Sequence, residues 1–97
     1  MTLQRKRRPG PIARLERLRK RIDAIDLRIL QLLDQRAVCV LRVGQLKRRK
    51  HQPVVDSQRE QDVLRQVTRA TTGPLSRRAI RSIFAEILRH SRRLQGR

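Results

Sequence analysis

The amino-acid sequence predicts an all-α fold with one long helix and two shorter ones. Apolar residues recur every three or four positions in three separate stretches, and each stretch is bounded by a cap, a proline or a glycine. The hydrophobic fraction of 37% is almost entirely aliphatic, and Phe84 is the only aromatic residue. Sandwiches and barrels draw more heavily on aromatic and β-branched residues, so packed helices are the better match. A chain of 97 residues suits one domain, or one protomer of an oligomer.

The long helix is predicted from about Leu15 to Arg49. Pro53 is expected to end it, because the residue before a proline disfavours helix. Its apolar residues follow a heptad seam, namely Leu15, Leu18, Ile22, Ile25, Ile29, Leu32, Cys39, Val43 and Leu46. Such a helix is roughly 50 Å long at ~1.5 Å per residue, whereas a compact monomer of this size has a radius of gyration of only ~12 to 13 Å. We therefore expect a second chain to cover the stripe, in an intertwined helical homodimer.

A second helix is signalled by polar residues that suit a helix N-terminus. Asp56 or Ser57 can cap it, and Ser57 with Glu60 matches a capping box. The helix should end near Ala70, because residues 71–74 read Thr-Thr-Gly-Pro, which is a turn signal.

A third helix is expected after Ser76, which can serve as its N-cap, and should run out at Gly96. Its apolar face comprises Ile80, Ile83, Phe84, Ile87, Leu88 and Leu94. Residues 1–13, which are basic and contain Pro-Gly-Pro, are expected to form a disordered arm. The folded domain is therefore predicted to span residues 14–97.

The chain is strongly basic, with 26 Lys and Arg residues against 8 Asp and Glu residues and a formal net charge of +18. Such a charge attracts polyanions, and nucleic acid is the first partner to consider. The basic residues are spread over the whole chain, however, and there is no aromatic platform on which single-stranded bases could stack. We therefore do not expect nucleic acid to be the partner.

Cysteine and histidine usage, together with the lack of long apolar runs, argues against disulfide-bonded, metal-binding and membrane-spanning proteins. Cys39 is the only cysteine, so it cannot form an internal disulfide, and with His51 and His90 it gives no metal-ligand spacing. No eighteen apolar residues occur together, and the basic N-terminus is not followed by the apolar run of a signal peptide. The sequence predicts a cytoplasmic protein that holds no metal and does not enter a membrane.

Polar side chains interrupt the apolar faces of all three predicted helices. The heptad seam continues to Arg36, and Lys47 lies within roughly 20° of the same face. In the second helix Glu60 precedes Leu64 and Val67 on one apolar stripe, and in the third Ser91 and Gln95 extend the apolar face. A charge on an apolar face is costly unless it has a partner. Together these groups predict a pocket for a small anionic ligand.

Each of these residues also has an ordinary structural explanation. Arg36 could snorkel or pair with an acid, and Lys47 could be a solvated cation at a helix C-terminus. Glu60 could serve only the capping box. Ser91 could hydrogen-bond to a carbonyl one turn earlier, and Gln95 could fray with the helix end. The convergence of residues from three helices is what favours a common site.

Several longer segments carry a more specific pattern, in the order LRKRIDAID (18–26), LLDQR (32–36), VGQLK (43–47), PVVDSQRE (53–60), and Ile83-Phe84 through Ser91 to Gln95. In this order they resemble the all-α (AroQ-type) chorismate mutases over about residues 15–95. The resemblance implies a monofunctional short form of that family, in which an interlocked dimer of three-helix protomers rearranges chorismate to prephenate. This pericyclic Claisen step, in aromatic amino acid biosynthesis, needs no cofactor.

The resemblance assigns three residues to catalysis. Lys47 matches the lysine that contacts the ether oxygen and a carboxylate of the substrate. Gln95 matches the second donor to that oxygen, and Glu60 matches the side chain that binds the ring hydroxyl.

Five further residues match substrate-binding positions. Arg36 corresponds to the arginine that grips a carboxylate, and Arg19 to the arginine that reaches in from the partner chain. Asp56 marks a backbone position near the ring hydroxyl, Arg59 is a further cation of the pocket, and Ser91 contacts a carboxylate. Arg19 lies about 40 Å along the helix from the catalytic lysine, so a shared site requires two chains.

Other interpretations stay open. The related isochorismate pyruvate lyases share the fold, but they lack the glutamate matched by Glu60. A mutase of 4-amino-4-deoxychorismate is harder to separate, because a carboxylate binds an amine as well as a hydroxyl. From a different class, the chain could be a basic nucleic-acid-binding module or a non-catalytic regulatory helical module. An enzyme of the shikimate pathway is a further candidate partner, since some small family members depend on one.

Overall fold

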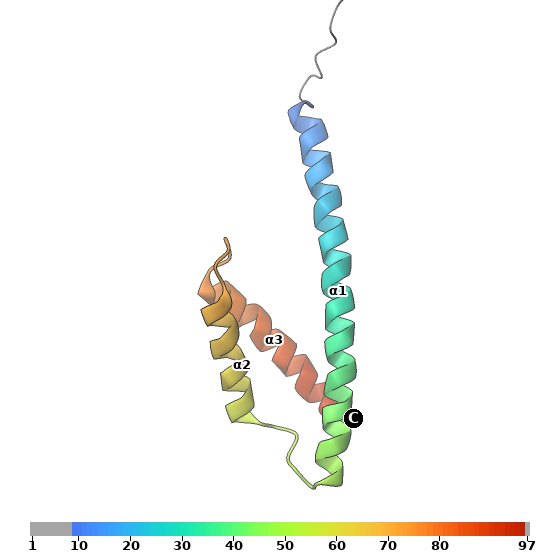
Figure 1. The fold of residues 1–97 in the computed structure, drawn as a ribbon, viewed down its shortest axis with the longest axis vertical. Coiled ribbons are helices and arrows are strands. Elements are labelled where there is room, and N and C mark those ends of the chain that lie inside the picture. Colours follow the sequence, from blue (N-terminus) through green and yellow to red (C-terminus); the bar gives the residue numbers. More distant parts are fainter. Residues whose placement is uncertain (1–8, 97) are drawn as a thin grey trace, which may run out of the picture. The chain divides into compact units, whose positions relative to one another are not determined.

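The computed structural model describes residues 9–96, which form three helices and no strand (Figure 1). Helix α1 spans Pro11–Arg49, α2 spans Ser57–Ala70 and α3 spans Arg77–Gln95. The prediction of an all-α fold with one long and two shorter helices is confirmed. Residues 1–8 of the predicted arm lie outside the described residues. Within the described part of the chain, no helix is both long and apolar enough to cross a lipid bilayer.

Helix α1 begins at Pro11 rather than near Leu15, so residues 11–13 are helical although the sequence placed them in the arm. Proline suits the first helical position, because its fixed φ matches the helix and its missing N–H would have no intrahelical partner there. The carbonyl of Gly10 accepts the first bond of the helix, from the backbone N–H of Arg14 at 3.0 Å. The helix start is thus set by the proline and not by the first apolar residue.

Helix α1 ends in the turn expected before Pro53. The backbone N–H of Gln52 donates to the carbonyl of Lys47 at 2.8 Å, and that of His51 donates to the carbonyl of Arg48 at 3.3 Å. This pair of bonds is a Schellman motif, which satisfies carbonyls that the helix end leaves free. The motif needs one residue in the left-handed region, and His51 occupies it with φ of 53°.

Polar side chains cap the two shorter helices. Asp56 is the N-cap of α2, and its carboxylate accepts a hydrogen bond from the backbone N–H of Arg59 at 2.9 Å. The predicted capping box of Ser57 and Glu60 was wrong, because Ser57 is already helical and the Glu60 carboxylate is paired elsewhere. Ser76 caps α3 as predicted.

The chain divides between Asp34 and Gln35 into two compact units. In the second unit α2 packs against α3 (Figure 1). Its core is small, with Val63, Leu64 and Leu88 buried and Phe84 packed against them. This core holds α2 and α3 together and so sets the relative positions of the polar residues they carry.

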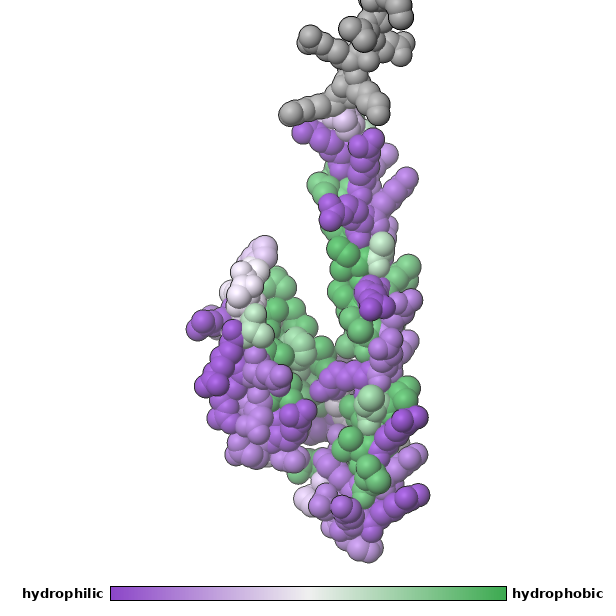
Figure 2. Space-filling model, viewed as in Figure 1, coloured by the Kyte–Doolittle hydropathy of each residue, from purple (hydrophilic) through white to green (hydrophobic). Residues whose placement is uncertain are grey.

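The first unit is the N-terminal part of α1, which carries an exposed apolar stripe. Leu18, Ile22 and Ile25 are each 53% exposed. Figure 2 shows hydrophobic side chains along this helix, interleaved with hydrophilic ones. Exposure of a whole stripe of large aliphatic residues is unfavourable in water, and such surfaces commonly mark interaction sites.

Candidate active site

One face of α1 in the second unit carries two cations separated by aliphatic residues. Arg36, Val40, Val43 and Lys47 follow each other at intervals of three or four, which places them on the same side of a helix. Val40 is buried, and the two cations are partly buried. Partly buried cations on an apolar face need polar partners, and α3 supplies most of them.

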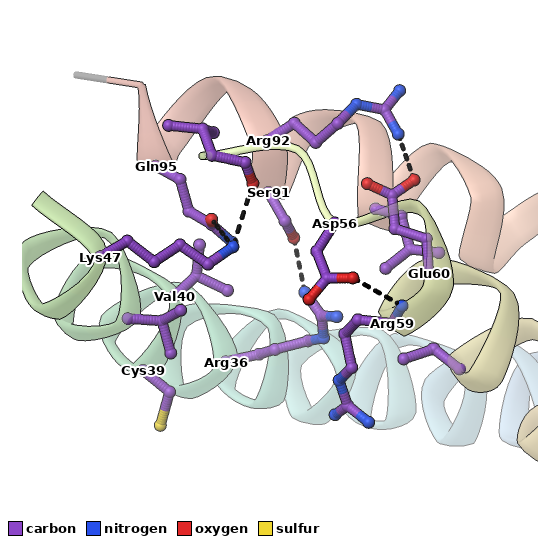
Figure 3. Close-up of a pocket in the computed structure, with 14 residues that line it drawn as sticks. Arg36, Cys39, Val40, Lys47, Asp56, Arg59, Glu60, Ser91, Arg92 and Gln95 are labelled. Atoms are coloured by element: carbon purple, nitrogen blue, oxygen red, sulfur yellow. Dashed lines mark hydrogen bonds and ion pairs between the residues drawn. The ribbon is translucent and has the colours of Figure 1, made fainter. Parts of the chain in front are cut away.

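Ser91 of α3 is the partner of Arg36. The Nη1 group of Arg36 donates to Ser91 Oγ (Figure 3). The same hydroxyl donates to the carbonyl of Ile87 at 2.7 Å. Ser91 is only 8% exposed, so its hydroxyl is held in one orientation. The structural explanation for Ser91, a hydrogen bond to the carbonyl one turn earlier, and its contact with Arg36 are both present. A hydroxyl has one proton to donate and lone pairs to accept, which allows both.

Lys47 is held at its ammonium group by two acceptors. Its Nζ donates to Gln95 Oε1 at 2.9 Å and to the carbonyl of Val54 at 3.0 Å. An ammonium group has three protons and no acceptor, so one N–H is left for another partner. For the same reason Gln95 must present its oxygen to Lys47, which leaves the amide NH₂ of Gln95 as a donor.

Gly44 allows α3 to approach α1 closely at this point. A Cβ built on Gly44 would lie 3.2 Å from both the Cα and the carbonyl oxygen of Gln95. The carbonyl of Gln95 also accepts a hydrogen bond from Arg48 at 3.0 Å. The glycine thus permits the backbone contact that brings Gln95 next to Lys47.

Helix α2 contributes Arg59 and Glu60 from its first turn, and Asp56 as its cap. The carboxylate of Glu60 forms an ion pair with Arg92 of α3 through Oε1 (Figure 3). The side chains of Arg92 and Glu60 are 38% and 21% exposed. Arg92 was not among the predicted site residues. The sequence did carry a signal for Arg92, because this residue lies three positions before Gln95 and therefore on the same face of α3.

These side chains surround a cavity of about 320 Å³ (Figure 3). This volume is at the lower end of the range of small-molecule sites. The lining residues are Arg36, Cys39, Val40, Val43, Lys47, Val54, Asp56, Arg59, Glu60, Val63, Leu88, Ser91, Arg92 and Gln95. Among these are four cations and two carboxylates, so the cavity suits an anion.

Seven of the eight predicted site residues therefore line one cavity, namely Arg36, Lys47, Asp56, Arg59, Glu60, Ser91 and Gln95. Arg19 is not among the lining residues and lies exposed in the first unit. The carbonyl of Val54, which accepts a hydrogen bond from Lys47, was not predicted to belong to the site. The apolar lining residues Cys39 and Val63 were not predicted either. A backbone carbonyl has no sequence signal, because every residue carries one.

Known proteins have a similar fold and a related sequence. The structure of chorismate mutase (form II) from Thermus thermophilus has a TM-score of 0.85 and 34% identity, and the match covers 87% of this chain and 96% of that chain. The structure of chorismate mutase from Helicobacter pylori in complex with prephenate has a TM-score of 0.79 and 28% identity, with 87% of this chain and 91% of that chain covered.

A curated relative is a longer protein. The bifunctional chorismate mutase/prephenate dehydratase of Aquifex aeolicus (strain VF5) is 33% identical over 78 residues, which cover 76% of this chain and 22% of that protein. The model of the family described as chorismate mutase type II matches residues 18–96. Because that match covers most of the chain and includes residues of all three helices, this protein belongs to the chorismate mutase type II family.

Proposed function

We propose that this chain rearranges chorismate to prephenate. The observation that carries the proposal is the convergence of Arg36, Lys47 and Gln95 on one cavity. The four cations and two carboxylates of the lining leave an excess of positive charge that suits a dicarboxylate substrate. Membership of the family and the prephenate complex of the Helicobacter pylori enzyme support the same activity. The reaction is intramolecular, so positioning and electrostatic stabilisation are the contributions required of the protein.

Substrate binding rests on the arginines. Ser91 takes up one N–H of Arg36. The other N–H groups of the planar guanidinium meet no acceptor among the described residues, so they can bind a carboxylate bidentately. Arg59 supplies a second cation from α2. At the other end of the substrate, Glu60 accepts a hydrogen bond from the ring hydroxyl, close to the backbone at Asp56. These contacts hold the dianion in the compact form that the rearrangement needs.

Stabilisation of the transition state rests on Lys47 and Gln95. As the C–O bond breaks, negative charge builds on the ether oxygen. The unused N–H of Lys47 and the amide NH₂ of Gln95 are both donors, and their mutual hydrogen bond holds them side by side. Their hydrogen bonds to the ether oxygen strengthen as charge develops, so they lower the barrier more than they tighten ground-state binding.

A second copy of the chain completes the site in this proposal and supplies Arg19. The apolar stripe of α1, with Leu18, Ile22 and Ile25 about half exposed, supports a homodimer in which this stripe is covered. Arg19 and Lys47 are 28 residues apart in the sequence, and at ~1.5 Å per helical residue this spacing favours two different chains as their sources for one small substrate. The arginine of each chain would therefore serve the cavity of the other.

We also propose that the chain acts in the cytoplasm. Cys39 is free and exposed, which suits a reducing compartment such as the cytoplasm. A shikimate-pathway enzyme remains a candidate partner, and the net charge of +18 favours one with an acidic surface.

The first experiment compares the wild-type chain, Lys47→Ala and Lys50→Ala in a spectrophotometric assay of chorismate depletion. Loss of one donor to a developing oxyanion costs ~10² to 10³-fold in turnover, so Lys47→Ala should lose most of its activity while retaining its helical circular dichroism. Lys50 follows the same helix but does not line the cavity, and its variant should keep wild-type turnover. The proposal fails if the wild-type chain leaves chorismate unchanged, or if Lys47→Ala turns over normally.

The second experiment tests the shared site by mixing Arg19→Ala and Lys47→Ala chains. Each variant alone should be nearly inactive. In a mixed dimer one of the two sites regains both residues, so random reassortment should recover about a quarter of wild-type activity. Activity no greater than the sum of the separate variants would show that Arg19 acts within its own chain or not at all.

A further inference from the structure

Arg92 is a cation of the cavity to which the proposed mechanism gives no role. It reaches from α3 to Glu60 on α2 and forms an ion pair with Oε1 of that carboxylate (Figure 3). Among the described residues no other partner of the Glu60 carboxylate is found, so Oε2 is available to a ligand. Arg92 therefore neutralises much of the negative charge of Glu60, the residue expected to bind the ring substituent of the substrate.

The charge at this point decides which ring substituent is favoured. A carboxylate without a cation beside it attracts an ammonium group by direct Coulomb interaction and accepts a hydrogen bond from a hydroxyl far more weakly. A carboxylate paired with a guanidinium is locally neutral, and an ammonium placed beside it also meets the positive charge of the arginine. The paired carboxylate still accepts a hydrogen bond from a neutral hydroxyl through its second oxygen.

We propose that Arg92, through its ion pair with Glu60, selects the ring hydroxyl of chorismate over the ring ammonium of 4-amino-4-deoxychorismate. The inference rests on the proposed function, since it assumes that Glu60 faces the ring substituent. The two substrates share the same dianionic framework and the same rearrangement. They differ at the position that Glu60 binds, so the ratio of their kcat/KM values isolates the effect of Arg92.

The expected effect follows from the interaction of two unit charges several ångströms apart. With an effective dielectric constant of about 20 and the partial exposure of Arg92, removing its charge should shift the ratio of kcat/KM values on the order of tenfold to a hundredfold toward the amine. A residue that only supported the fold would change both kcat/KM values by the same factor and leave their ratio unchanged.

The experiment measures kcat/KM for both substrates with four proteins: the wild-type chain, Arg92→Gln, Arg92→Lys and Arg93→Gln. Arg92→Gln removes the charge and should shift the ratio toward the amine. Arg92→Lys keeps the charge and should retain a ratio close to that of the wild type. Arg93 is the exposed neighbour on the same helix and does not line the cavity, so Arg93→Gln controls for net charge. Arg92→Met provides a second neutral variant if Arg92→Gln is poorly folded by circular dichroism.

The possible results separate the two proposals. Turnover of chorismate by the wild type, with a ratio that is unchanged in the neutral Arg92 variants, overturns the role of Arg92 and leaves the mutase function intact. The same holds if Arg93→Gln shifts the ratio as much as Arg92→Gln. Turnover of neither substrate by the wild type overturns the proposed function and this inference with it.

Discussion

Replacing Gly44 by alanine should slow turnover without unfolding the protein. The new Cβ would lie 3.2 Å from the Cα and the carbonyl oxygen of Gln95. Carbon atoms in favourable contact are ~3.5 to 4.0 Å apart, so the backbone of Gln95 must retreat by a few tenths of an ångström. Gln95 is the residue that bonds to Lys47 at 2.9 Å, and the displacement therefore falls on the pair proposed to stabilise the ether oxygen.

Stability and activity should respond differently to this substitution. Alanine is favoured over glycine inside a helix by ~1 kcal/mol, whereas overpacking at a close contact costs ~1 to 3 kcal/mol. The net loss of unfolding free energy should thus lie between about 0 and 2 kcal/mol. A misplacement of about 1 Å in an active site can lower the rate by ~10²-fold, so a few tenths of an ångström should lower kcat roughly threefold to tenfold.

The assay is kcat from chorismate depletion, together with a thermal melt at fixed protein concentration. Gly73→Ala is the matched control, because its Cβ would meet no atom within 4 Å and no glycine of the described chain has a positive φ. Gly73→Ala should keep wild-type kcat. The reasoning is refuted if Gly44→Ala turns over as fast as the wild type, or if the two variants lose activity equally.

Two further substitutions test single contacts. Ser91→Ala removes the acceptor that orients Arg36. A hydrogen bond to a charged group is worth ~1.5 to 3 kcal/mol, so kcat/KM should fall about tenfold or more through a higher KM. An unchanged KM would contradict this expectation. His51→Gly relieves the left-handed conformation at φ 53°, where a side chain costs roughly 1 kcal/mol, and should raise the melting temperature by a few degrees with unchanged kcat. His51→Ala keeps a Cβ, so its melting temperature should not rise. A lower melting temperature for His51→Gly would contradict the assignment of a Schellman motif with His51 in the left-handed region.

The helical architecture was predictable because its determinants are local. Periodic apolar residues, the Ser76 cap and the residue before Pro53 act within one or two turns of chain, so their effects can be followed in order along the sequence. The errors arose where two local signals competed. Both Asp56 and Ser57 can cap, and Asp56 did so. Pro11 extended α1 beyond the first apolar residue, because a proline is well tolerated at the first helical position.

The order of the residues was also enough to single out the candidate site residues, because a charge or amide on an apolar stripe is unusual at helical spacing. Which of them meet was decided only by the packing of α2 and α3 and the close approach that Gly44 permits. Glu60 illustrates the difference, since its spacing suited a capping box and the fold paired it with Arg92 instead. Contacts between helices join residues far apart in the chain, and no periodicity records them. For Arg19, the apolar stripe of α1 points to a second chain, whose packing would decide what that arginine meets.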